Sequence, residues 1–302
     1  WDKLDVDMLH IGYILLLDAL DEEIAAIEDR VNTLNIETRK ADMEAVAEGL
    51  GKEIEKPMEE KHIMTDIEVR SSKEYIDAFA QYLKTGKGKL LPLPRYVASD
   101  LFKVMEGAAY LLTLEKDEKL EQRMDEIIDV IAEAQADDGY LYEYHQVAEW
   151  MRNPANKWGT GHRPYSNVLF GHELYNMGHM YEGAIAYYQA TGKRKWLDVA
   201  EKSAQHINKV FFEGDPAYND GKPVNQAPGH QEIELALIKM YRVTGDTLYL
   251  NMAKRFIDIR GVTFNPEGKS IRAADYAQQH LPVREQRTAV GHAVRATYLY
   301  SG

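Results

Sequence analysis

Three histidines occur in the same local context, and their chemistry suits the binding of a hydroxylated ligand. His172, His230 and His292 each follow a glycine, and each lies at or near the start of a predicted helix. A neutral imidazole has one donor and one acceptor nitrogen, which matches the hydroxyl groups of a sugar. A single histidine in such a place is more often a local cap or a satisfied core residue. Three in one repeated context favour a shared binding site.

Acidic residues are a second source of chemistry, and they occur in pairs at 59–60, at 137–138 and at Glu232 with Glu234. Glycosidic hydrolysis commonly uses two carboxylates about 5 to 10 Å apart, a separation that spacing along the chain does not reveal. Most of these acids are typical of helix starts or a solvated surface. Asp138 and Tyr140, on a loop between predicted helices, are further candidates for substrate binding.

Metal binding finds little support in the spacing of the histidines. His172 and His179 share a helix face, but they lie about two turns, roughly 10 Å, apart, which is too far for two ligands of one ion. His172 and Glu173 are not followed by a histidine at position 176, so the zinc-protease motif is absent. The sequence therefore predicts no metal ligands. It also contains no phosphate-binding glycine loop, nucleophile elbow or kinase signature.

The elements that must position the histidines are repeated helical hairpins. The apolar spacing predicts a helix over 167–190, a Thr-Gly turn at 191–192 and a second helix over 194–210. The same order returns from Ile233, with a Thr-Gly turn at 244–245, 53 residues after the first, and a helix over 247–259. Glycine after a helix supplies a left-handed cap. Stacked hairpins form an open solenoid or a closed double ring, which would gather equivalent helix starts on one face.

The chain as a whole divides into two parts. Residues 1–98 are helical or irregular and carry no chemical motif, so we interpret them as an N-terminal segment of unclear role. From 99 to 302 the helical pattern is sharper, with Ser99 or Asp100 as the expected N-cap of one helix and Leu120–Ala134 as the next. The final helical stretch stops while the hairpin pattern is still running, so we expect the natural chain to continue past Gly302.

Composition excludes some classes of protein. The net charge of -13 argues against a nucleic-acid surface, which needs clustered Lys and Arg. No run approaches the roughly 20 apolar residues that cross a membrane. The 302 residues contain no cysteine, so disulfides, cysteine metal ligands and a cysteine nucleophile are excluded within them. The compartment stays open between cytoplasmic, periplasmic and secreted, and a homodimer is compatible with the sequence.

Five motifs occur in order between residues 99 and 302. They are Ser99–Glu106, Asp138–Leu141, His172–Tyr175 with Gly178-His179, Gly229–Leu237, and Pro282–Gln286 with Gly291–Arg295. Together they resemble the β-L-arabinofuranosidase family of glycoside hydrolases, family 127 and its relatives. Five motifs over two hundred residues are far more specific than any one of them.

This resemblance implies an all-α (α/α) toroid of the six-hairpin glycosidase type that acts on arabinofuranose-like or related plant-type glycans. It implies that His172, His230 and His292 contact the bound sugar. It also implies a zinc-bound cysteine nucleophile and a glutamate acid/base, which in the family lie downstream of the Gly-His-Ala-Val-Arg motif. We therefore expect no catalytic residue, no metal ligand and no cofactor among the present residues.

Two alternatives remain open at this point. An (α/α) barrel sugar epimerase would use histidine pairs as acid and base near neutral pH and would need no cysteine. A non-catalytic helical protein that binds a carbohydrate or another partner would have its histidines scattered rather than gathered.

Overall fold

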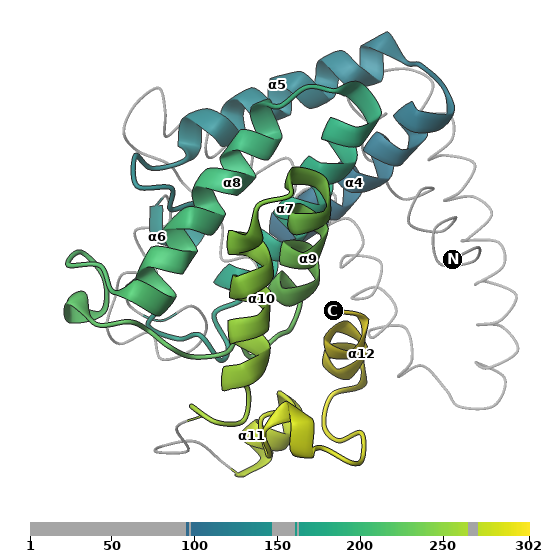
Figure 1. Ribbon diagram of the computed structural model, residues 1–302. Helices are drawn as coiled ribbons and strands as arrows, with labels where there is room; N and C mark the ends of the chain where they lie inside the picture. The colour runs from purple at the N-terminus through teal and green to yellow at the C-terminus, as the bar shows by residue number, and fades with distance from the viewer. Residues whose placement is uncertain (1–94, 97, 147–160, 162, 265–270) are drawn as a thin grey trace, which may run out of the picture.

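All regular secondary structure in the described residues is helical (Figure 1). The computed structural model describes residues 95–96, 98–146, 161, 163–264 and 271–302. The α-helices are α4 (Ala98–Leu114), α5 (Glu118–Ala134), α6 (Glu143–Gln146), α7 (Glu173–Thr191), α8 (Lys195–Asn208), α9 (Ile233–Thr244), α10 (Thr247–Ile259), α11 (Ile271–Tyr276) and α12 (Ala293–Ser301). Tighter or wider helical turns are η3 (Lys209–Glu213), η4 (Asn219–Gly221) and η5 (Val283–Glu285). The expected all-α class is confirmed for these ranges.

The helices form two layers that follow from their order in the chain. An inner row runs α4, α7, α9 and α12, each packed against the next, and an outer row contains α5, α8 and α10 (Figure 1). Each of the first three inner helices also packs against the outer helix that follows it, so α4–α5, α7–α8 and α9–α10 are hairpins. Inner helix starts therefore lie near one another, as the hairpin repeat predicted.

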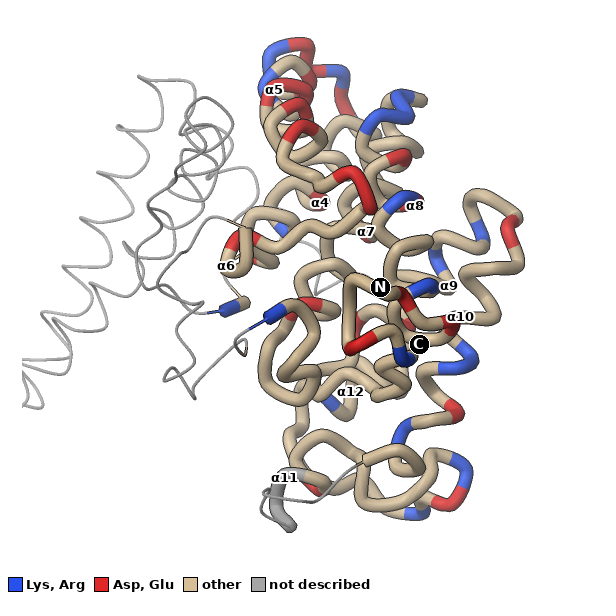
Figure 2. Tube along the Cα trace, turned by 90° about the vertical axis from the view of Figure 1, so that its left-hand side faces the viewer, with Lys and Arg blue, Asp and Glu red and all other residues tan. Residues whose placement is uncertain are grey.

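Helix α7 is the centre of the described structure. Every residue from Glu173 to Tyr187 is buried, and a helix that is buried on all sides needs neighbours all round it. Its only Asp, Glu, Lys or Arg residues are Glu173 and Glu182, whereas α5 carries charges along most of its length (Figure 2). One continuous apolar core extends from α4 through α10. The two carboxylates of α7 thus lie in an environment that normally excludes charge.

Glycine turns close two of the hairpins. Gly192 and Gly245 have φ of 74° and 76°, and their N–H groups donate to the carbonyls of Tyr188 and Tyr241. A Cβ at either position would meet nothing within 4 Å, so the positive φ alone favours glycine there. Both predicted Thr-Gly turns are confirmed.

Helix boundaries differ from the prediction at two places. Helix α7 begins at Glu173 rather than at 167, because the preceding residues form turns and His172 has a left-handed φ of 64°. Helix α4 already begins at Ala98, so Ser99 lies in its first turn instead of capping it. The Ser99 hydroxyl accepts a hydrogen bond from Lys103 Nζ. The predicted N-cap at Ser99 or Asp100 was therefore wrong.

Gly178 lets α7 and α9 approach closely. A Cβ on Gly178 would lie 2.5 Å from Glu232 Cγ and 3.0 Å from the backbone nitrogen of Ile233. Any larger residue would push the start of α9 away from α7. This contact brings the residue after Gly178, which is His179, against Glu232.

Several predictions lie outside the described residues. Of the proposed N-terminal segment 1–98, only Arg95, Tyr96 and Ala98 are described, and most of the irregular segment 145–165 is likewise outside. Within the described ranges, none of the helices combines the length and apolar character that a membrane span requires.

Candidate functional site

His172 and His230, here called the histidine pair, lie side by side at the starts of two adjacent inner helices. His172 immediately precedes α7 and His230 lies three residues before α9. Their ring centroids are 5.9 Å apart, and both side chains are partly exposed. The layered fold therefore brings together two residues that are 58 positions apart in the sequence.

Tyrosine rings surround the histidine pair. The Tyr175 ring lies 4.3 Å from His230 and 5.6 Å from His172, measured between centroids. Tyr298 of α12 lies 5.3 Å from His230, and Tyr96 lies 5.6 Å from His172. Tyrosine combines an apolar face with a polar hydroxyl. Such a wall can contact both the C–H surface and the hydroxyl groups of a sugar.

Hydrogen bonds to the backbone orient both imidazoles. His172 Nδ1 lies 2.8 Å from the carbonyl oxygen of Phe170, and His230 Nδ1 lies 2.7 Å from that of Gln231. Arg95 Nε also lies 3.1 Å from His172 Nδ1, but one nitrogen cannot both donate to the carbonyl and accept from the arginine. The shorter carbonyl contact favours a proton on Nδ1, which leaves Nε2 as an acceptor on each ring.

The pair is neutral near pH 7. Burial lowers the pKa of His172 to about 4, and the positive charges of Arg95 and Arg295 act in the same direction. Burial lowers the pKa of His230 to about 3, again with Arg295 contributing. Neutral imidazoles hydrogen-bond to uncharged hydroxyls without carrying a charge into the site.

His292, the third predicted histidine, is connected to the pair through Arg295. His292 caps α12 by accepting from the Arg295 backbone nitrogen, and its ring lies 5.0 Å from Tyr276. The Arg295 guanidinium donates to the carbonyl of Gly229, next to His230. His292 is also close enough to lower the pKa of His230 electrostatically. The structure thus places all three histidines in one region.

Asp138 and Tyr140 belong to a second group, the Tyr140 cluster, made of Asp138, Tyr140, Tyr165, Glu173, His206 and Tyr218. The buried Tyr140 hydroxyl donates to Glu173 at 2.7 Å, and the Tyr165 backbone nitrogen donates to both oxygens of the same carboxylate. Asp138 accepts from the Tyr218 hydroxyl at 2.6 Å. These contacts occupy the groups that were predicted to bind sugar, and that role stays a prediction.

Burial changes the protonation of the carboxyl groups near this cluster. It raises the pKa of Glu173 to about 8, although the hydrogen bonds from Tyr140 and Tyr165 oppose the shift. Burial also raises the pKa of Glu143, on α6, to about 8, with the Glu173 charge adding to the effect. Each is therefore protonated more often than a surface glutamate near neutral pH.

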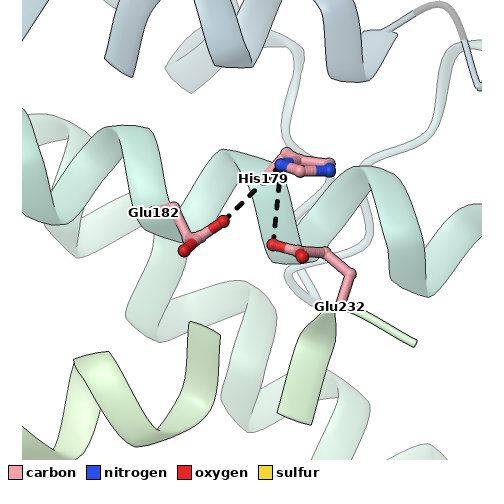
Figure 3. Close-up of side chains that lie close together, drawn as sticks. All are labelled: His179, Glu182 and Glu232. Carbon is pink, nitrogen blue, oxygen red and sulfur yellow. Dashed lines mark ion pairs between the residues drawn. The ribbon is translucent and has the colours of Figure 1, made fainter. Parts of the chain in front are cut away.

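A third group, the His179 cluster, consists of His179 and Glu182 on α7 and Glu232 just before α9 (Figure 3). His179 Nδ1 lies 3.6 Å from Glu182 Oε2 and 3.5 Å from Glu232 Oε1. All three side chains are buried. Burial lowers the pKa of His179, while burial and the nearby Glu182 raise the pKa of Glu232.

The His179 cluster was not predicted from the sequence. One signal was present, because His179 and Glu182 are three residues apart and so share one face of a helix. The third member was not predictable from spacing. Glu232 reaches the site only because Gly178 allows the start of α9 to approach α7.

Comparison with known proteins identifies the family. Residues 58–302 match the GH127 catalytic domain of β-L-arabinofuranosidases. A non-reducing end β-L-arabinofuranosidase of Bifidobacterium longum subsp. longum is 38% identical over 220 residues, which cover 68% of this chain and 31% of that protein. The chain therefore belongs to the GH127 β-L-arabinofuranosidase catalytic-domain family.

Two solved structures are similar to the chain. The crystal structure of Ara127N-Se, a GH127 β-L-arabinofuranosidase from Geobacillus stearothermophilus T6, has a TM-score of 0.64 and 38% identity, over 75% of this chain and 35% of that one. BT3674, a GH127 β-arabinofuranosidase, has a TM-score of 0.65 and 36% identity, over 78% and 34%. The helices thus belong to the six-hairpin (α/α) fold of these enzymes. The chain spans about a third of the length of each of these relatives.

Proposed function

We propose that this chain is the sugar-binding part of a glycoside hydrolase that cleaves β-L-arabinofuranosidic or related bonds in plant-type glycans. The observation that carries the proposal is the histidine pair, two neutral imidazoles 5.9 Å apart with tyrosine rings around them. Membership of the family supports the substrate class. His292, tied to the pair through Arg295, is the third proposed sugar contact.

The residues around the pair hold it ready for a neutral ligand. Backbone carbonyls fix the two Nδ1 atoms, so the Nε2 atoms accept hydrogen bonds from sugar hydroxyls. Lys103 Nζ donates to the Tyr175 hydroxyl at 3.0 Å, which positions the ring nearest to His230. Binding groups that are already oriented lose less entropy when the ligand arrives.

The zinc-bound cysteine that the family resemblance implies does not fit the residues present. A zinc–thiolate site needs cysteine sulfur, and the 302 residues contain none. We therefore place no nucleophile, zinc ligand or acid/base of that kind on any residue of this chain. Its proposed contribution is to bind and orient the sugar.

The low pKa values of the pair also bear on the epimerase alternative. Acid–base catalysis by histidine is most efficient when its pKa lies near the working pH. Burial lowers the pKa of His172 to about 4 and that of His230 to about 3. These values support hydrogen bonding, rather than proton transfer, as the role of the pair.

The test is His230→Ala in the full-length protein as its source makes it. We expect kcat/KM on p-nitrophenyl β-L-arabinofuranoside to fall by about 100-fold, because a contact to the sugar is lost, while the unfolding midpoint changes little. His280→Ala, outside the pair, is the control and should keep full activity. Wild-type turnover by His230→Ala would refute the assignment of the site, and no hydrolysis by the unaltered protein would refute the proposed activity.

A further inference from the structure

We propose that His179, Glu182 and Glu232 bind one divalent transition-metal cation of the Zn²⁺ type. This site is separate from the histidine pair, and it needs no cysteine. It uses one imidazole nitrogen and one carboxylate from α7 and a second carboxylate from the residue just before α9 (Figure 3).

The spacing of the donor atoms fits an ion better than it fits hydrogen bonds. The distances from His179 Nδ1 to the two carboxylates, 3.6 Å and 3.5 Å, exceed the usual range of about 2.7 to 3.2 Å for a hydrogen bond. Zinc binds nitrogen and oxygen at about 2.1 Å, and two ligands of a tetrahedral ion are then about 3.4 Å apart. The ligand atoms of all three residues lie within 4.8 Å of one another.

Several lone pairs in the cluster have no donor facing them. His179 Nε2 lies 3.5 Å from the Tyr298 hydroxyl, a contact as long as those of Nδ1, and a proton carried on Nε2 leaves Nδ1 as an acceptor facing two carboxylates. Within the described ranges, Nδ1 and both oxygens of Glu232 lack a hydrogen-bond partner. Residue exposure is 3% for His179 and 1% for Glu232. Buried acceptors that converge without a donor are costly, and a cation between them removes that cost.

The charges near the cluster leave room for a divalent ion. Lys239 Nζ donates to Glu182 Oε1 and lies 3.9 Å from Glu106 Oε1. Lys103 also acts on His179, but it is paired with Asp100 at 3.7 Å, so these two charges cancel. The remaining three carboxylates and one ammonium group carry a net charge of about -2 when all are ionised, which one divalent cation balances. Because Lys239 engages Oε1 of Glu182, the other oxygen, Oε2, is the one that faces His179.

The donor types select among metals. Calcium and magnesium prefer sites made of oxygen alone, whereas imidazole with carboxylate suits zinc and its transition-metal neighbours. Apart from its close contact with Glu182, neither oxygen of Glu232 accepts a hydrogen bond from the described residues, so this carboxylate can bind through both oxygens and supply a fourth donor. The second nitrogen of His179 would donate to Tyr298, as metal-binding histidines commonly do to a neighbouring acceptor. The ion would thus connect α7 to the start of α9. It would lie close to Tyr298, whose ring also contacts His230 of the histidine pair.

The experiment measures zinc binding by the full chain, independently of any enzymatic activity. The protein is treated with a chelator, dialysed and titrated with ZnCl₂ in a calorimeter, and bound zinc is counted by mass spectrometry after a second dialysis. We expect one tightly bound equivalent. We also expect the unfolding midpoint to rise by about 5 °C at saturation, because the ion binds only the folded state.

His179→Gln and Glu232→Gln test the ligands, and Glu173→Gln is a matched control with an equally buried carboxyl on α7. Each ligand variant should bind zinc at least about 100-fold more weakly, whereas the control should keep the affinity of the unaltered protein. Circular dichroism checks that each variant is folded. Less than a tenth of an equivalent in the unaltered protein would overturn the proposal and favour a proton shared between Glu182 and Glu232. Binding that survives both ligand substitutions would also overturn it.

Discussion

The histidine pair and the Tyr140 cluster meet at the start of α7, where consecutive residues enter different environments. His172 belongs to the pair, is partly exposed and uses only Nδ1 in hydrogen bonds with the described backbone. Glu173 belongs to the cluster, is buried and accepts from Tyr140 and Tyr165. Both groups contain residues that can bind sugars or transfer protons. They differ in how much of their hydrogen-bonding capacity the protein itself uses.

This difference separates binding from structural support. A polar group whose partners are all internal stabilises the fold and has nothing left for a ligand. The Tyr140 hydroxyl uses its one donor on Glu173 in a buried place, whereas the pair presents acceptors at a partly exposed surface. Substitutions in the Tyr140 cluster should therefore lower stability, and substitutions in the pair should lower affinity.

The largest expected effect on stability comes from Glu173→Ala. The change leaves the Tyr140 hydroxyl and the Tyr165 N–H without their acceptor in a buried place, and it opens a cavity. We expect the free energy of unfolding to fall by about 3 kcal/mol in urea denaturation. His172→Ala, one residue earlier, is the control and should change it by less than about 1 kcal/mol. Equal losses in the two variants would remove the distinction between the regions.

A smaller effect is expected from pH. Glu143 and Glu173 have a pKa of about 8 in the folded protein against 4.5 as the ordinary value, so above pH 4.5 the native state binds more protons than the unfolded state. Stability therefore falls as pH rises toward 8. The lowered pKa values of His172 and His230 act in the opposite direction, but only below about pH 6.5, where an unfolded imidazole becomes protonated.

The informative window is therefore pH 6.5 to 8, above the range in which the unfolded imidazoles titrate. Glu232, whose pKa burial also raises, acts there in the same direction as Glu143 and Glu173. We expect the free energy of unfolding to decrease there by at least about 3 kcal/mol. Glu173→Gln should remove at least about a third of the decrease, because the amide does not titrate. A stability that is flat or rising across this window would show that the two carboxyl groups are ionised in the folded protein.

The smallest effect is expected from Asp138→Asn at the exposed edge of the Tyr140 cluster. An asparagine oxygen can still accept from the Tyr218 hydroxyl or the Tyr140 N–H, so stability should fall by less than about 1 kcal/mol. Titration with methyl β-L-arabinofuranoside, followed by calorimetry, then checks the role predicted from the sequence. A tenfold loss of affinity would add Asp138 to the sugar contacts, and unchanged affinity would limit it to support.

Much of the architecture was predictable because it depends on local signals. The two Thr-Gly turns and the apolar spacing between them define hairpins, and hairpin repeats place helix starts together. The proximity of His172 and His230 follows from that order. The start of α7 was predicted six residues early, because apolar spacing does not reveal the turn that ends at His172.

What was not predictable depends on contacts between distant segments. The Tyr140 hydroxyl meets Glu173 across 33 residues, and only packing decides that it is used internally. The His179 cluster depends on the close approach at Gly178, which one sequence without its structure does not reveal. Local patterns thus predicted the helices and the histidine pair, while tertiary packing determined which polar groups remain accessible.

The glycines that end α7 and α9 have a consequence for chirality. At Gly192 and Gly245 the backbone has a φ of 74° and 76°, which is the φ that a mirror-image amino acid favours. An L-alanine there would be strained, but D-alanine prefers this conformation. A protein assembled by chemical ligation with D-alanine at both turns should keep its hairpins and gain about 0.5 to 1 kcal/mol at each, because its unfolded chain has fewer conformations to lose.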